Sequence, residues 1–523
     1  MSDNMLIDAP GAALQNAPQD TVRDAPLNAP AASAYVSAPA AKTVRTRYAP
    51  SPTGSMHIGN LRTAIYEYLI AKSQDGAFVL RIEDTDQNRF VDGAIQLVYD
   101  TLKITGLAHD EGPDIGGAYG PYIQSERRDI YMKYALRLVE RGAAYHCFCS
   151  KERLAALKDE NERAGLTNFY DRRCLSLPQS AVRENLDGGA EFVIRQKMPS
   201  SGKTVFRDAV YGEMEFDNRY LEDQILIKSD GLPTYNFANV VDDHLMAITH
   251  VARGSEYLTS TPKYHLLYGA FGWEPPVYVH LPQIVKEGGK KLSKREGDAS
   301  FFDLLEEGYM QEAIVNWIVL MGWSPPDNRE VFTLGELAET FSIKGISKSP
   351  ASMDLAKLRY FNAEHLRRKT PEEFYELALP YIKQAIANPG VDARKVAQTL
   401  SQRTEMLCEI PGMIGFIEEM PEFSDELYTH KKMKTDPDIA KTALKLALPA
   451  LSGLSPWDGE HIRDALTALA EGAGLKNSQI LWPLRVALTG LPVTPGGAVE
   501  IADILGREES LRRIEAAYDK LTL

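Results

Sequence analysis

The segment from residue 44 to residue 84 constrains the fold more than any other. "VRTRYA" (44–49) predicts a short strand, and the loop that follows is rich in proline and glycine. A helix is predicted from about Asn60, because the apolar residues between Leu61 and Leu69 recur at helical spacing. "AFVLRIED" (77–84) predicts a second strand. A strand–helix–strand unit is typical of a parallel sheet, so we predict an α/β fold with ligands at the carboxyl ends of its strands.

The loop "APSPTGSMHIG" (49–59) leads directly into that helix. A helix N-terminus exposes unpaired backbone N–H groups and the positive end of a dipole, which suits an anion. An ordinary strand-to-helix turn explains the stretch equally well when it is taken alone. The choice between the two therefore depends on the rest of the chain.

Composition limits the class of protein. The chain has 523 residues, 44% hydrophobic and 25% charged, which suits a soluble protein of about three or four domains. We find no long apolar run and no signal-peptide pattern, and only four cysteines, so we expect a cytoplasmic protein without membrane contact. A net charge of −14 argues against indiscriminate nucleic-acid binding, although local basic patches could still hold an RNA.

Five segments differ in pattern. Residues 1–43 are rich in alanine and proline and predict a disordered tail. Residues 44–129 and 224–328 predict the two halves of a nucleotide-binding α/β domain, split by an inserted α+β segment at 130–223. Residues 329–523 predict an all-α region, with runs such as "EEFYELALPYIKQAIA".

Two short motifs resemble the signatures of class I aminoacyl-tRNA synthetases. "HIGN" (57–60) resembles their HIGH motif, and "KLSKR" (291–295) resembles their KMSKS loop. Each pattern is short, but their order and their settings together make coincidence improbable. Asn60 departs from the usual histidine; it still donates a hydrogen bond but carries no charge.

Longer stretches resemble the bacterial glutamyl-tRNA synthetase family from about residue 44 to residue 520. They are "RYAPSPTGSMHIGNLRTAIYEYL", "RIEDTD", "GLPTYNFANVVDDHLM", "KLSKR", "SKSPASMDLAKLRYFN" and "LRVALTG". The resemblance implies a Rossmann-type catalytic domain, an inserted domain that binds the tRNA acceptor stem, and a helical anticodon-binding region. It implies ATP-dependent activation of L-glutamate with Mg²⁺, then transfer to the 3′ end of tRNA(Glu). Whether tRNA(Gln) is also charged stays open.

Glutamate activation requires two anions to be positioned, and no protein nucleophile. His57, Gly59 and Asn60 suit the phosphate and ribose side of ATP, whereas Lys291 and Lys294 suit the outer phosphates. By resemblance, Glu256 and Leu281 lie near the nucleotide. We expect Arg47 and Arg253 to clamp carboxylates and Glu83 to pair with the α-ammonium; a structural ion pair is the alternative for each arginine. The remaining expected glutamate contacts are Ala49, Ser51, Tyr235 and Asn239.

The cysteines suggest a metal site. Cys147 and Cys149 precede Tyr170 and Cys174, and three thiolates with one phenolate could bind Zn²⁺ tetrahedrally. In some glutamyl-type enzymes the last ligand lies two residues after the third cysteine, where this chain has Ser176, whereas related tRNA-base-modifying enzymes use a tyrosine at the Tyr170 spacing. Free buried thiols without metal remain the alternative.

The resemblance favours a monomeric glutamate–tRNA ligase over three rivals. The long helical region argues against a tRNA-base-glutamylating relative, and "RIEDTD" with late helices argues against a glutaminyl-type synthetase. A non-catalytic RNA-binding paralogue would not need His57, both lysines and both arginines together.

Overall fold

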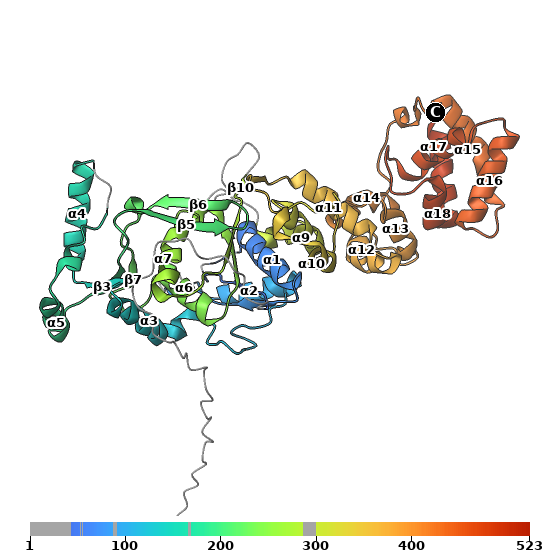
Figure 1. Cartoon of the computed structure of the whole chain (residues 1–523). Helices are drawn as coiled ribbons and strands as arrows, with labels where there is room; N and C mark the ends of the chain where they lie inside the picture. The colour runs from blue at the N-terminus through green and yellow to red at the C-terminus, as the bar shows by residue number, and fades with distance from the viewer. Residues whose placement is uncertain are drawn as a thin grey trace, which may run out of the picture. The chain divides into compact units, whose positions relative to one another are not determined.

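The parallel unit predicted at the start of the chain is confirmed. The computed structural model describes residues 43–52, 54, 56–86, 91–165, 169–285 and 300–522. Strand β1 (Arg45–Tyr48) pairs in parallel with β2 (Ala77–Leu80). Helix α1 (Ile58–Lys72), drawn in blue in Figure 1, connects them. The turn into β2 needs Gly76, since a Cβ there would lie 2.3 Å from the Val44 carbonyl oxygen.

Helix α1 begins two residues before the predicted Asn60, and β2 ends before Arg81 rather than continuing to residue 84. The continuation is a single parallel bridge between Ile82 and Ile123. Both differences lie at element ends, where short-range pattern is weakest.

A second parallel pair continues this α/β region. Strand β8 (His250–Gly254) pairs with β9 (Val277–Leu281), with α6 (Tyr235–Leu245) before them and α7 (Thr261–Phe271) between them. β8 lies beside β1, where the Thr249 N–H donates to the Arg45 carbonyl at 2.9 Å. The hairpin of β5 (Lys203–Asp208) and β6 (Gly212–Asp217) joins β9 through an Asp208–Tyr278 bridge.

A three-stranded antiparallel sheet lies between these halves in sequence. It has the order β3 (Ala144–Cys147), β4 (Val193–Gln196) and β7 (Ile225–Ile227). The other helices before residue 285 are α2 (Ala94–Ile104), α3 (Arg128–Glu140), α4 (Lys151–Arg163) and α5 (Gln179–Asp187).

Beyond residue 329 the described chain is helical, as predicted, apart from β11 (Ala351–Ser352), which pairs with β10 (Ile284–Val285). The run of helices already begins at Phe301, before the predicted boundary. Three of the first five helices of this region carry capping boxes, in which a serine or threonine and an acidic side chain satisfy each other's backbone N–H groups. The helices are α8 (Phe301–Glu306), α9 (Gln311–Leu320), α10 (Leu334–Thr340), α11 (Leu355–Arg367), α12 (Pro371–Ala385), α13 (Ala393–Leu400), α14 (Ile410–Ile414), α15 (Pro437–Ser452), α16 (Gly459–Gly472), α17 (Asn477–Thr489) and α18 (Ala498–Lys520). None of the helices in the described ranges has both the length and the apolar composition needed to cross a membrane.

Candidate active site

A cavity of about 340 Å³ opens at the carboxyl ends of β1, β2 and β8. This is where ligands of parallel sheets are expected. The structure brings eight of the predicted site residues to its wall: Arg47, Ala49, Ser51, Asn60, Glu83, Tyr235, Arg253 and Glu256. Thr63, Asp86 and Tyr257 also line it and were not predicted.

Arg253 supplies a buried cation to this cavity. Its residue is only 6% exposed, and its Nε and NH1 groups have no hydrogen-bond partner within the described part of the chain. Its guanidinium lies over two rings, 4.6 Å from the centroid of Tyr264 and 5.7 Å from that of Tyr257. A buried charge without a counter-ion is costly, so the wall of the cavity at Arg253 is suited to an anion.

Arg47 is held differently. Its Nε donates to Asp243 Oδ1 and its NH1 donates to Glu67 Oε1, each at 2.9 Å. Burial lowers the pKa of Arg47, but the two carboxylates outweigh that effect and raise it. Arg47 therefore lines the cavity and also takes part in the structural ion pairs considered as the alternative for it.

Glu83 offers one free carboxylate oxygen. Its Oε1 accepts from Arg81 NH2 at 2.9 Å, whereas its Oε2 is buried without a hydrogen-bond partner in the described residues. Burial raises the pKa of Glu83, against the lowering influence of Arg81 and Arg47. The free oxygen is suited to a cationic group such as an ammonium.

Asp243 connects the two sides of this arrangement. Its Oδ1 accepts from Arg47 Nε at 2.9 Å and from Arg81 NH1 at 2.8 Å, so one buried carboxylate fixes side chains from β1 and from the end of β2. Sequence reasoning missed Asp243, Arg81 and Glu67. Asp243 and Arg81 stand inside the motifs "VVDDHLM" and "RIED", which is the one signal that could have found them.

Asn239 and Tyr235 lie one turn apart on α6. Asn239 is 1% exposed, does not line the cavity, and has no hydrogen-bond partner for either side-chain amide atom in the described ranges. Such unsatisfied buried groups are uncommon and need a reason. Burial raises the pKa of Tyr235 well above its usual value, so its phenol stays protonated and can donate a hydrogen bond.

The N-terminus of α1 faces the same region. His57 is the N-cap residue, and the first intrahelical bond runs from the Leu61 N–H to the His57 carbonyl at 3.0 Å. The N–H groups of the first turn are therefore free of helical partners. Among the described residues, no atom lies within 4 Å of a Cβ added at Gly59, so they leave open space above it.

Some predicted residues lie elsewhere. His57, Gly59 and Leu281 do not line the cavity, and the Leu281 side chain is fully buried in the apolar core. Lys291 and Lys294 belong to residues 286–299, outside the described residues.

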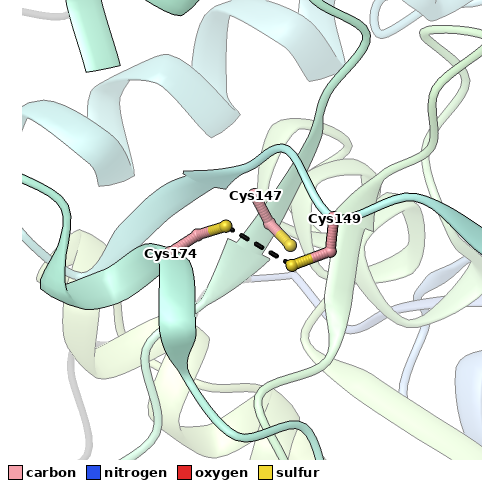
Figure 2. Close-up of side chains that lie close together, drawn as sticks. All are labelled: Cys147, Cys149 and Cys174. Carbon is pink, nitrogen blue, oxygen red and sulfur yellow. Dashed lines mark hydrogen bonds between the residues drawn. The ribbon is translucent and has the colours of Figure 1, made fainter. Parts of the chain in front are cut away.

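Three thiols gather in a separate cluster at the end of β3. The sulfur atoms of Cys147, Cys149 and Cys174 lie within 4.8 Å of one another, and Figure 2 shows them converging from three directions. The Tyr170 hydroxyl lies 3.4 Å from Cys147 Sγ and 3.3 Å from Cys149 Sγ. Ligand atoms around tetrahedral Zn²⁺ are separated by about 3.8 Å, so these four donors have nearly the required spacing. Ser176 is exposed, whereas Tyr170 is buried among the thiols.

The family of "tRNA synthetases class I (E and Q), catalytic domain" matches residues 43–360, which include every cavity-lining residue and the thiol cluster. The chain belongs to this synthetase family. An "anticodon binding domain" matches residues 373–518 of this E/Q-type synthetase, within the helical region.

Curated glutamate–tRNA ligases are similar to this synthetase over most of its length. The enzyme of Clostridium kluyveri is 55% identical over 480 residues, which cover 92% of this chain and 98% of the relative. The enzyme of Clostridium acetobutylicum is 52% identical, covering 92% of this chain and 99% of the relative.

Solved structures are similar as well. A glutamate–tRNA ligase from Elizabethkingia meningosepticum, crystallised with its amino acid, has a TM-score of 0.81 and 35% identity over 92% of this synthetase and 100% of that chain. The glutamate–tRNA synthetase of Elizabethkingia anophelis has a TM-score of 0.80, with 34% identity over 91% of this synthetase and 100% of that chain.

Proposed function

We propose that the chain activates L-glutamate with ATP and transfers the glutamyl group to the 3′ end of tRNA(Glu). The observation that carries the proposal is Arg253, a buried guanidinium on the cavity wall without a hydrogen-bonded anion in the described residues. It stands in a cavity that also offers the free oxygen of Glu83. An amino acid with a side-chain carboxylate and an α-ammonium satisfies both groups.

The roles in glutamate binding follow from this pairing. Arg253 binds the side-chain carboxylate with help from Arg47, and Glu83 binds the α-ammonium. Ser51, Tyr235 and Asn239 supply hydrogen bonds, and the backbone at Ala49 borders the amino acid. The protonated phenol of Tyr235 and the unpartnered amide of Asn239 support these roles.

ATP lies against the start of α1 in this proposal. His57, Gly59 and Asn60 contact its phosphates and ribose, the open space above Gly59 admits the nucleotide, and Glu256 and Leu281 lie near it. An oxygen of the glutamate α-carboxylate attacks the α-phosphorus, the bond to the bridging oxygen breaks, and pyrophosphate leaves. Lys291 and Lys294 stabilise the charge that grows on the leaving group. A ribose hydroxyl of the tRNA then attacks the glutamyl carbonyl and releases AMP.

Mg²⁺ suits this arrangement. Asp86 and Glu256 place two further carboxylates on the cavity wall, and Mg²⁺ bound to nucleotide phosphates needs one or two of them. The ion would neutralise phosphate charge during pyrophosphate departure.

Zn²⁺ suits the thiol cluster in the same way. Cys147, Cys149, Cys174 and Tyr170 would hold it, and none of them borders the 340 Å³ cavity. We therefore assign the ion a structural role: it would fix the turn after β3 against the segment around Cys174.

The remaining expectations belong to this proposal. The segment at 130–223 binds the tRNA acceptor stem and the helical region from 329 binds the anticodon, while residues 1–43 have no catalytic role. The protein acts as a cytoplasmic monomer.

A charging assay tests the function. Purified protein with ATP and Mg²⁺ should attach radiolabelled glutamate to tRNA(Glu), and it should not attach glutamine. Parallel reactions without ATP provide the control, and reactions with tRNA(Gln) show whether a second tRNA is accepted. Faster charging with glutamine than with glutamate would contradict the proposal.

A further inference from the structure

The guanidinium of Arg253 is held by rings rather than by a carboxylate. The closer ring is that of Tyr264, whose centroid lies 4.6 Å from the guanidinium carbon. Tyr264 is fully buried on α7, and a cation above an aromatic face in a desolvated site is held by the ring quadrupole. The orientation of the Tyr264 ring therefore determines where the Arg253 charge stands.

Four hydrogen bonds, here called the circuit, run from the Tyr264 hydroxyl to the backbone carbonyl of the preceding residue and fix Tyr264. Its hydroxyl donates to Asn236 Oδ1 at 2.8 Å, and Asn236 Nδ2 donates to Gln224 Oε1 at 2.8 Å. Gln224 Nε2 donates to Gln196 Oε1 at 2.7 Å, and Gln196 Nε2 donates to the Lys263 carbonyl at 3.3 Å. Lys263 is the residue before Tyr264, so the circuit returns to its starting point.

Every bond of the circuit runs in the same direction. Each amide accepts through its oxygen and donates through its nitrogen, an arrangement in which neighbouring bonds polarise and strengthen one another. The phenol must act as the donor, and burial raises the pKa of Tyr264, which keeps it protonated. The circuit joins α7, the start of α6, the end of β4 and the residue before β7, and it contacts Arg253 through the ring of Tyr264.

We propose that Tyr264 is a positioning residue for Arg253, and that the bond to Asn236 fixes Tyr264 in that position. The circuit thereby determines how sharply the cavity distinguishes a carboxylate from a carboxamide. This inference rests on the proposed function. A guanidinium that could tilt would accommodate the amide of glutamine, whereas fixed donors reject a group that points N–H donors at them.

Two substitutions test the bond between Tyr264 and Asn236. Tyr264→Phe keeps the ring beneath Arg253 and removes only the hydroxyl. Asn236→Ala removes the acceptor of that hydroxyl together with the Asn236 bond to Gln224. Tyr278→Phe is the matched control, because Tyr278 is a buried tyrosine whose hydroxyl has no hydrogen-bond partner in the described ranges. The measurements are kcat and KM for glutamate and for glutamine with tRNA(Glu) present, with the melting temperature of each variant.

We expect Tyr264→Phe and Asn236→Ala each to raise KM for glutamate by about five- to tenfold, with kcat within about twofold of wild type. The preference for glutamate over glutamine should fall by a similar factor, and KM for ATP should not change. The double variant should be no worse than Asn236→Ala alone, since the bond between Tyr264 and Asn236 is already lost in that single variant. Tyr278→Phe should match wild type.

The inference fails if Tyr264→Phe keeps the wild-type preference for glutamate, or if the effects of the two substitutions add. A variant with a lower melting temperature but an unchanged preference for glutamate over glutamine would show that the circuit has only a structural role. Wild-type protein that does not charge tRNA with glutamate would instead overturn the proposed function itself, so the two failures are distinguishable. Asn236 is only half-buried, and Asn236→Ala keeps the test available if Tyr264→Phe does not fold.

Discussion

Two arginines that look alike in sequence have different environments. Arg47 donates to two buried carboxylates of the protein, whereas the described residues offer no such partner to Arg253 Nε and NH1. The charge of Arg47 is therefore balanced within the protein, whereas the charge of Arg253 is available to a ligand. We therefore expect discrimination between glutamate and glutamine to depend mainly on Arg253.

Arg253→Gln should lower kcat/KM for glutamate by about a hundredfold to a thousandfold, because a buried charge pair with the ligand is lost. It should also narrow the preference for glutamate over glutamine, since an uncharged amide at position 253 does not require a carboxylate as its partner. Steady-state charging with both amino acids measures this ratio. Arg219→Gln is the matched control: Arg219 is exposed and pairs only with Asp217 within the described chain. An unchanged ratio in Arg253→Gln would make this arginine structural.

At the scale of elements, contacts between side chains, rather than strand pairing, connect the segments around the thiol cluster and the helices around Arg513. The thiol cluster gathers around the end of β3, and Arg513 connects helices of the C-terminal region. Each of these attachments involves polar groups that would be unsatisfied without their partners.

The thiol cluster predicts a metal content. Freshly purified protein should contain about one zinc per chain, and Cys174→Ser should lose it, because one of four tetrahedral ligands is removed. Ser176→Ala should keep its zinc, since Ser176 is exposed and Tyr170 occupies the fourth position. Elemental analysis measures the content of all three proteins. Wild-type protein without stoichiometric zinc would contradict the metal site, and the cluster would then be three reduced thiols near one another.

Arg513 of α18 predicts a loss of stability. It is 4% exposed and donates to the carbonyls of Phe416 and Leu488 at 2.8 Å and to that of Ile417 at 3.0 Å. Arg513→Met preserves most of the volume but leaves these carbonyls without their donor, so the free energy of unfolding should fall by about 3 kcal/mol.

Urea unfolding followed by tryptophan fluorescence measures this loss, because Trp457 and Trp482 lie in the same region. Arg512→Met is the control: Arg512 is the neighbouring residue, shares the partner Glu509, and has a side chain that is 64% exposed. Equal unfolding curves for the two variants would show that the Arg513 contacts contribute no more than a surface ion pair.

The whole molecule carries a net charge of −14, yet its proposed partner is a polyanion. Net repulsion at long range means that binding must rely on local contacts between basic side chains and phosphates. Each such contact releases counter-ions from the RNA, and the free energy gained from that release falls as the salt concentration increases.

KM for tRNA should therefore rise at least about tenfold between about 50 mM and about 200 mM KCl. KM for glutamate should change by less than about twofold, because its contacts are buried and poorly screened. Charging kinetics over a KCl series measure both constants. A KM for tRNA that does not respond to salt would mean that phosphate contacts contribute little to binding.

The sequence alone determined the elements and the neighbourhood of the site. Its helical periodicity and strand patterns predicted α1, the parallel pair β1–β2 and the helical region from residue 329, because these depend on residues a few positions apart. Motif resemblance placed Arg253, Glu83 and Tyr235 together, and all three line the 340 Å³ cavity.

Only the tertiary structure decided which polar groups are already satisfied. The partner of Arg47 Nε lies 196 residues away, and Tyr264 reaches Asn236 across 28 residues, so no local pattern records either contact. The same holds for the thiol cluster, where the fold buries the Tyr170 hydroxyl among the sulfur atoms and leaves Ser176 in solvent. Hydrogen bonds and ion pairs form between groups that are close in space, and closeness across such separations exists only after the chain has packed.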